Sequence, residues 1–105
     1  MSWQRYYVTV PKNREGYDEY DHGIEHTDNL IEYILPIDEY TALHKNGVFR
    51  ILENSFNVYI SDGESCEITA DQLKNVYQAI NVLPGVFLSA VDKAIELGTC
   101  ICLDF

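Results

Sequence analysis

The chain has 105 residues, 47% of them hydrophobic, and a formal charge of -10 because 17 Asp and Glu outnumber 7 Lys and Arg. This length predicts one domain spanning residues 1–105, and the apolar content excludes a disordered acidic chain. A strongly negative field repels nucleic acid and anionic membranes. It therefore argues against both as direct partners and favours a cationic one.

The N-terminal segment, MSWQRYYVTV, lacks the apolar core of a signal peptide. No apolar run approaches the roughly 18 residues that a membrane span needs. The cysteines are odd in number, which in a chain without an export signal predicts reduced thiols. They are Cys66, Cys100 and Cys102. We expect a cytoplasmic location.

The first third of the chain divides into three segments of different composition. Residues 4–10 are rich in aromatic and β-branched types and predict a strand that stops at Pro11. Residues 11–23 are polar and turn-rich, which favours a long exposed loop. Residues 28–35 fit neither the helical nor the strand period cleanly, and we favour a strand that ends before Pro36.

Two short helices are expected next. Asp38 can cap a helix over residues 39–46, and Gly47 can end it in a left-handed conformation. Apolar residues recur at helical spacing over residues 48–52, which predicts the second helix.

Residues 57–68 predict a β-hairpin whose two strands flank SDGES. A two-residue turn would place an apolar residue opposite a charged one. An odd-length loop instead pairs Ile60 with Cys66 and Val58 with Ile68, which gathers the apolar residues on one face. We expect the odd loop.

A helix with clear boundaries follows the hairpin. Thr69 and Gln72 have the spacing of a capping box, and the helix that they open is expected to end at residues 84–85, Pro-Gly. A second helix carries its apolar face over residues 87–95 and stops at Gly98.

The last segment, residues 99–105, alternates and predicts a strand. Its core face would hold Ile101, Leu103 and Phe105. Together these elements predict an α+β fold in which four to five mainly antiparallel strands pack with three to four helices.

Three features of the sequence bear on possible chemistry. His22 and His26 have the i, i+4 spacing of metal ligands, but Gly23 between them disfavours the helix that would align them. The cysteines fit buried structural positions better than a thiolate site. No phosphate loop or nucleophile arrangement is present, so we expect no enzymatic activity, no metal and no cofactor. A small enzyme or metal-dependent module built on the two histidines is the weaker alternative.

An acidic segment from Glu15 to Glu39 holds nine of the 17 carboxylates and is interleaved with tyrosines. A second acidic group comprises Asp62, Glu64, Glu67 and Asp71. One interpretation is a solvated face, and the other is a surface that binds a basic protein, since carboxylates steer a cation and tyrosines supply contact area. The candidate partner-binding residues are Tyr17, Asp18, Glu19, Tyr20, Asp21, Glu25, Asp62, Glu64 and Glu67.

This profile of a small acidic α+β protein with tyrosines among its acids resembles the immunity proteins of bacterial toxin systems. These include the partners of contact-dependent inhibition toxins and of nuclease bacteriocins. The resemblance implies an inhibitor whose carboxylates stand in for phosphates in a basic nuclease cleft. The alternative is a phage-type nucleic-acid mimic that inhibits a nucleic-acid-binding defence protein.

Overall fold

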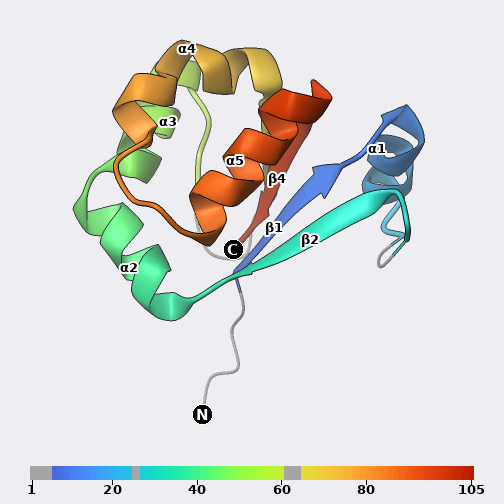
Figure 1. The fold of residues 1–105 in the computed structure, drawn as a ribbon, viewed down its shortest axis with the longest axis horizontal. Coiled ribbons are helices and arrows are strands. Elements are labelled where there is room, and N and C mark those ends of the chain that lie inside the picture. The colour runs from blue at the N-terminus through green and yellow to red at the C-terminus, as the bar shows by residue number, and fades with distance from the viewer. Residues whose placement is uncertain (1–5, 25–26, 61–64) are drawn as a thin grey trace.

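A computed structural model describes residues 6–24, 27–60 and 65–105. The strands are β1 (Tyr6–Pro11), β2 (Leu30–Leu35), β3 (Ser65–Thr69) and β4 (Cys100–Asp104). They form one antiparallel sheet in the order β2-β1-β4-β3. The helices are α1 (Arg14–Asp21), α2 (Ile37–Lys45), α3 (Val48–Phe56), α4 (Ala70–Ile80) and α5 (Val86–Leu97). The α+β prediction is confirmed (Figure 1).

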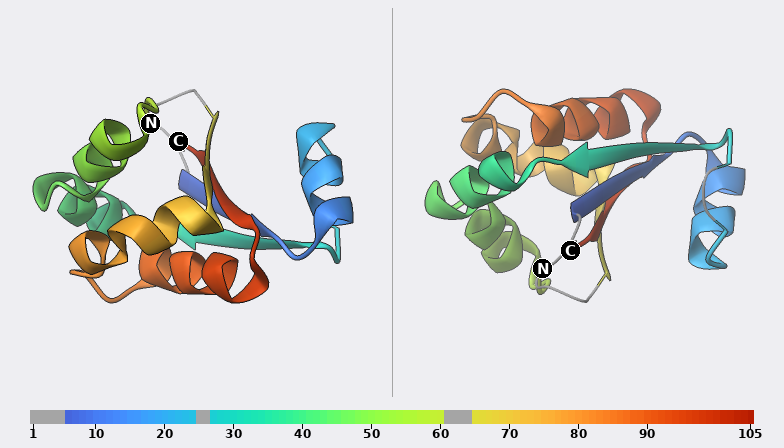
Figure 2. Two further views of the ribbon diagram at one scale, coloured as in Figure 1. Left: turned by 90° about the horizontal axis from the view of Figure 1, so that it is seen from above. Right: turned by 90° about the horizontal axis from the view of Figure 1, so that it is seen from below.

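The helices are divided unequally between the two sides of the sheet (Figure 2). Helices α2 to α5 gather on one side, and α5 contacts β1, β2 and β4. Helix α1 lies apart from them, near the end of the sheet where β1 connects to β2. Among the described helices, α2 to α5 therefore lie on one side of the sheet and α1 lies on the other.

Strand alternation separates the residues of the two faces. Val8 and Val10 of β1, together with Leu103 of β4, are among the buried residues beneath α5. We call the opposite side the outer face. The cross-strand register places on it Tyr7, Thr9, Glu32, Ile34, Cys102, Asp104, Ser65 and Glu67.

The core contains an aromatic cluster centred on Phe49, which is 1% exposed. Its ring centroid lies 5.7 Å from that of Phe87, 5.4 Å from Phe105 and 5.6 Å from Tyr40. These contacts join α3 to α5, to α2 and to the residue that follows β4. Edge-to-face and tilted ring pairs of this kind stabilise the fold beyond the free energy gained by burying the rings.

Most boundaries in the second half agree with prediction. Thr69 accepts a hydrogen bond from the backbone N–H of Gln72 while the Gln72 side chain bonds the Thr69 N–H, so the capping box at the start of α4 is confirmed. Helix α4 ends at Ile80, earlier than expected. Gly98 ends α5 with a left-handed φ of 70°. Strand β4 has the predicted core face, and Ile101 is 0% exposed.

The predicted short helices are present with altered limits. Helix α2 begins at Ile37 with Pro36 at its N-cap, so Asp38 lies in the first turn and is not the cap. Gly47 has the predicted left-handed backbone, at the N-cap of α3. Helix α3 extends to Phe56, beyond the expected residue 52.

The predicted loop over residues 11–23 is wrong, because most of it forms α1. The Asn13 side chain accepts a hydrogen bond from the Gly16 N–H at 2.8 Å and caps the helix. Gly16 is buried against Asn29, and a Cβ at that position would overlap the Asn29 carbonyl oxygen. Absence of a side chain at Gly16 therefore lets α1 approach the strand connection closely.

The predicted hairpin over residues 57–68 is also wrong. Strand β3 pairs with β4, with Cys66 opposite Leu103 and Ile68 opposite Ile101. Residues 57–60 form no strand, and the Ile60 N–H donates instead to the Glu53 carboxylate at 3.0 Å. The loop between them, residues 61–64, lies outside the described residues. Strand β4 offers the apolar face of β3 a longer apolar segment to pair with than residues 57–60 do.

The three cysteines are free and buried, as expected for structural positions. The sulfur atoms of Cys100 and Cys102 lie 3.9 Å apart, well beyond the roughly 2 Å of a disulfide bond. Within the described residues, no helix has the length and apolar content needed to cross a bilayer.

Candidate functional site

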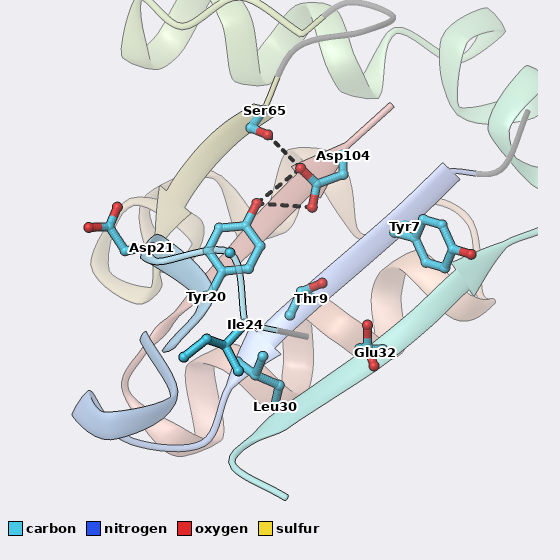
Figure 3. Close-up of a pocket in the computed structure, with 10 residues that line it drawn as sticks. Tyr7, Thr9, Tyr20, Asp21, Ile24, Leu30, Glu32, Ser65 and Asp104 are labelled. Carbon is cyan, nitrogen blue, oxygen red and sulfur yellow. Dashed lines mark hydrogen bonds between the residues drawn. The ribbon is translucent and has the colours of Figure 1, made fainter. Parts of the chain in front are cut away.

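A hollow of about 600 Å³ lies between α1 and the outer face of the sheet (Figure 3). Strands β1, β2, β3 and β4 contribute to its floor, and the end of α1 with the following turn forms its wall. We call it the acidic hollow. It is lined by Tyr7, Thr9, Tyr20, Asp21, Gly23, Ile24, Leu30, Glu32, Ser65 and Asp104.

The charge of this lining has one sign. Asp21, Glu32 and Asp104 are carboxylates, and none of the described lining residues is Lys or Arg. Hydroxyl groups from tyrosine, serine and threonine surround them. A concave site with a few converging polar groups is the usual form of a binding pocket. Its charge selects for a cationic ligand.

Tyr20 connects α1 to the floor of the hollow. Its hydroxyl donates to both Asp104 oxygens, at 3.0 and 2.9 Å, and the Ser65 hydroxyl donates to the same carboxylate at 2.5 Å. Burial raises the pKa of Tyr20 well above its ordinary value, and Cys102 and Asp104 contribute to the rise. Tyr20 is therefore a neutral donor at physiological pH.

Tyr17 makes the second connection, since its hydroxyl donates to the Glu67 carboxylate of β3 at 2.7 Å. This hydrogen bond and the charge of Glu67 raise the pKa of Tyr17 to about 12. The bond brings the acidic segment on α1 beside a member of the second acidic group. In the structure both tyrosine hydroxyls bind the protein's own sheet, a use that the sequence did not suggest.

The remaining predicted partner-binding residues differ in setting. Glu19 accepts hydrogen bonds from the Thr27 hydroxyl at 3.1 Å and the Asn29 amide at 3.0 Å, so it stabilises the connection to β2. Asp18 and Asp21 are exposed on α1. The other three predicted residues lie outside the described residues: Glu25, Asp62 and Glu64.

The metal hypothesis gains no support from the geometry. The His22 ring nitrogen Nδ1 lies 2.7 Å from the Asp18 carbonyl oxygen, an interaction within the end of α1. His26 is not among the described residues. Over residues 6–24, 27–60 and 65–105, no three His, Cys, Asp or Glu side chains come together as metal ligands.

Sequence reasoning missed the floor of the hollow. The predicted core face of residues 99–105 leaves out Asp104, and Tyr7 and Thr9 fall within the predicted strand over residues 4–10. The register places Tyr7 opposite Asp104 and Thr9 opposite Glu32, which brings residues from distant segments onto one surface. Alternation indicated the side of each residue, but no feature of the sequence gave the strand order.

The tyrosine contacts predict an alkaline transition. Tyr17 keeps its proton in the folded state up to about pH 12, against an ordinary pKa of 10.0. The stabilisation of the fold by the hydrogen bond from Tyr17 to Glu67 is therefore complete below pH 10 and is lost as the pH rises through 12. Absorbance titration of phenolate should show a late component that Tyr17→Phe and Tyr20→Phe each reduce. The exposed control Tyr59→Phe should leave that component unchanged, and a curve unaffected by all three would contradict the contacts.

No protein-family model, curated protein or solved structure matches the chain. Function is therefore inferred from the chain's own residues, above all from the acidic hollow beside α1.

Proposed function

We propose that this protein binds and neutralises a basic protein partner through the outer face and α1. The observation that supports this most directly is the acidic hollow, whose described lining includes the three acidic residues Asp21, Glu32 and Asp104 and no Lys or Arg. The exposed acids Asp18 and Asp21 extend the same charge along α1. A basic surface would be steered toward this side of the molecule.

Apolar contact area accompanies the charge. Ile24 lines the hollow and is 49% exposed, while Ile34 lies on the outer face beside Tyr7 and is 51% exposed. Protein interfaces combine apolar contacts with polar surroundings, and charge supplies association rate more than affinity. These two isoleucines are suited to anchor a partner that the carboxylates attract.

Among basic partners we propose the nuclease domain of a toxin, with the chain acting as its immunity protein in the cytoplasm. A nuclease holds phosphates with Lys and Arg in its cleft, and carboxylates on a complementary surface can occupy the same groups. The chain would then act by covering a catalytic cleft and would itself carry out no reaction.

The test begins with capture of partners from a lysate of the source cell at low salt, followed by identification by mass spectrometry. We expect a basic nuclease that dissociates as salt rises from about 0.1 to 0.5 M. Adding an equimolar amount of the chain should abolish cleavage of DNA or RNA by that nuclease. Recovery of no basic protein, or of a nuclease that stays active, would reject the proposal.

Charge removal on α1 should change the association rate. The double variant Asp18→Asn, Asp21→Asn should bind the captured partner about three- to tenfold more slowly at low salt, with a weaker dependence on salt. The matched control Asp38→Asn, Asp92→Asn removes two charges from α2 and α5, which lie on the opposite side. Stopped-flow kinetics measures both, and equal slowing by the two variants would indicate a net-charge effect without a defined surface.

A further inference from the structure

A pair of thiols is buried on the outer face of the sheet. Cys100 and Cys102 alternate along β4 with Ile101 and Leu103, which belong to the core cluster. The two cysteines are nevertheless only 4% and 1% exposed, and their sulfur atoms lie 3.9 Å apart. A residue on the outer face can be this well buried only where another segment covers the sheet. Helix α1 is the described helix on that side (Figure 2).

The tyrosines of α1 hold the helix above these thiols. Tyr17 donates to Glu67, which pairs with Cys102 across the sheet. Tyr20 donates to Asp104, which follows Cys102 on the same side of β4. Both hydroxyls therefore bind immediate neighbours of Cys102. Burial and Cys102 itself raise the pKa of Tyr20, which agrees with a short distance between that ring and the thiol.

Helix α1 contributes nothing to the apolar core. Gly16 is its one buried residue, and none of residues 14–21 belongs to the core cluster or packs against it. A helix of eight residues is marginal in water without tertiary contacts. Its side chains bond to the connection into β2 through Glu19, and to β3 and β4 through Tyr17 and Tyr20. Segments with few apolar contacts open locally while the rest of a domain stays folded.

We propose that α1 is a movable cover over Cys100 and Cys102, and that a low-molecular-weight disulfide modifies these thiols when the helix moves away. While α1 is in place Cys102 is unreactive, because its hydrogen bond with Cys100 and its burial raise its pKa, and only a thiolate attacks a disulfide. Opening admits water and removes the burial. A group attached to Cys102 has no room beneath α1, so the modification would hold the helix away from the sheet.

The reaction is thiol–disulfide exchange. The uncovered thiol loses its proton, and its sulfur attacks one sulfur of the disulfide R–S–S–R. A bond forms between these two sulfurs, the original S–S bond breaks, and the other half leaves as a thiolate that takes up the proton. The cysteine is thereby oxidised and the small disulfide is reduced. An added thiol such as dithiothreitol reverses the step.

The uncharged disulfide dithiodipyridine is a suitable probe, because the acidic surface does not repel it and each exchange releases a thiopyridone that is measured by absorbance. Cys66 is the internal control, since it is 8% exposed and lies in the core cluster on the other face. Static exposure alone would make Cys66 react first. We expect the pair to react about tenfold or more faster than Cys66, at a rate that low urea barely changes.

Mass spectrometry of partly modified protein identifies which cysteine has reacted. Modification of Cys66 first would overturn the proposal. Modification of all three cysteines together, at a rate that rises steeply with urea, would also overturn it, because that pattern requires unfolding of the whole domain.

Tyrosine variants test the contacts that hold the cover. Tyr17→Phe and Tyr20→Phe should speed modification of the pair about threefold and about tenfold, because the first bond is exposed and the second is half-buried. The matched control Tyr77→Phe removes another hydroxyl bond to a carboxylate, to Asp92 at 2.6 Å, on the helical side. It should leave the rate at the pair unchanged, and Cys66 should react no faster in the test variants than in this control. Equal rates at the pair in all three variants would reject the cover.

The state of α1 after modification is read from ¹⁵N-edited NMR spectra. In the modified protein the amides of residues 14–21 should move toward random-coil positions while those of α5 stay in place, and dithiothreitol should restore the starting spectrum. Unchanged α1 amides in fully modified protein would overturn the cover, since the added group would then fit beneath a closed helix. Only the probe and the chain take part, so the outcome does not depend on the proposed partner.

Discussion

Replacing Phe49 with alanine is expected to destabilise the protein by about 3–5 kcal/mol, a large part of the roughly 5–15 kcal/mol that holds a domain folded. Phe49 is 1% exposed, and its ring contacts Phe87, Phe105 and Tyr40. Its removal would leave a cavity where α2, α3, α5 and the end of β4 meet. The surrounding helices are held by other contacts and can close such a cavity only in part.

Urea unfolding followed by far-UV circular dichroism measures this loss. The control is Phe56→Ala on the same helix, because Phe56 is only half-buried at the edge of the core. We expect the control to cost about half as much or less, in proportion to the apolar area that it buries. Equal losses from the two variants would show that Phe49 does not occupy the centre of the core.

The second large effect is expected from Glu39→Ala, at about 2–3 kcal/mol of stability. The Glu39 carboxylate accepts the backbone N–H of Val86 at 3.0 Å and of Phe87 at 2.7 Å. It thus caps the N-terminus of α5, where Gly85 supplies no side-chain cap of its own. A Cβ on Gly85 would lie 2.5 Å from the Glu39 carboxylate, so the missing side chain admits the contact.

The neighbouring Asp38 provides the control, since it is exposed in the first turn of α2. Asp38→Ala should cost at most about 0.5–1 kcal/mol, the value of a helix-dipole interaction at a surface. Chemical unfolding compares the two variants, and hydrogen exchange at Val86 and Phe87 identifies the site of the change. Stability losses that do not differ, or unchanged exchange at those two amides, would contradict the capping role.

Local patterns predicted those parts of the fold that local interactions determine. The capping box at Thr69 and Gln72 and the left-handed Gly98 depend on a few adjacent residues, and both are found. Helix α1 was missed because its sequence is as polar as a loop. Its position depends on Asn29, Glu67 and Asp104, which belong to other segments.

The hairpin error has a related cause. Pairing residues 57–60 with residues 66–68 satisfied the alternation of apolar residues, but so did pairing with β4, and periodicity does not decide between partners. The candidate site shares this limitation. The excess of acid was evident in the composition, whereas the hollow exists only because the sheet places Thr9 between Glu32 and the strand of Asp104.

The position of β4 in the sheet has a consequence for how the chain folds as it is made. Strand β4 joins β1 to β3, with Thr9 opposite Cys102 and Cys66 opposite Leu103. During synthesis on the ribosome β1 and β2 can pair early, but β3 has no neighbour until residues 100–104 have emerged. Contacts so distant in sequence slow folding. The nascent chain therefore holds exposed strand edges until β4 has been made, and in that interval aggregation or a chaperone would act on it.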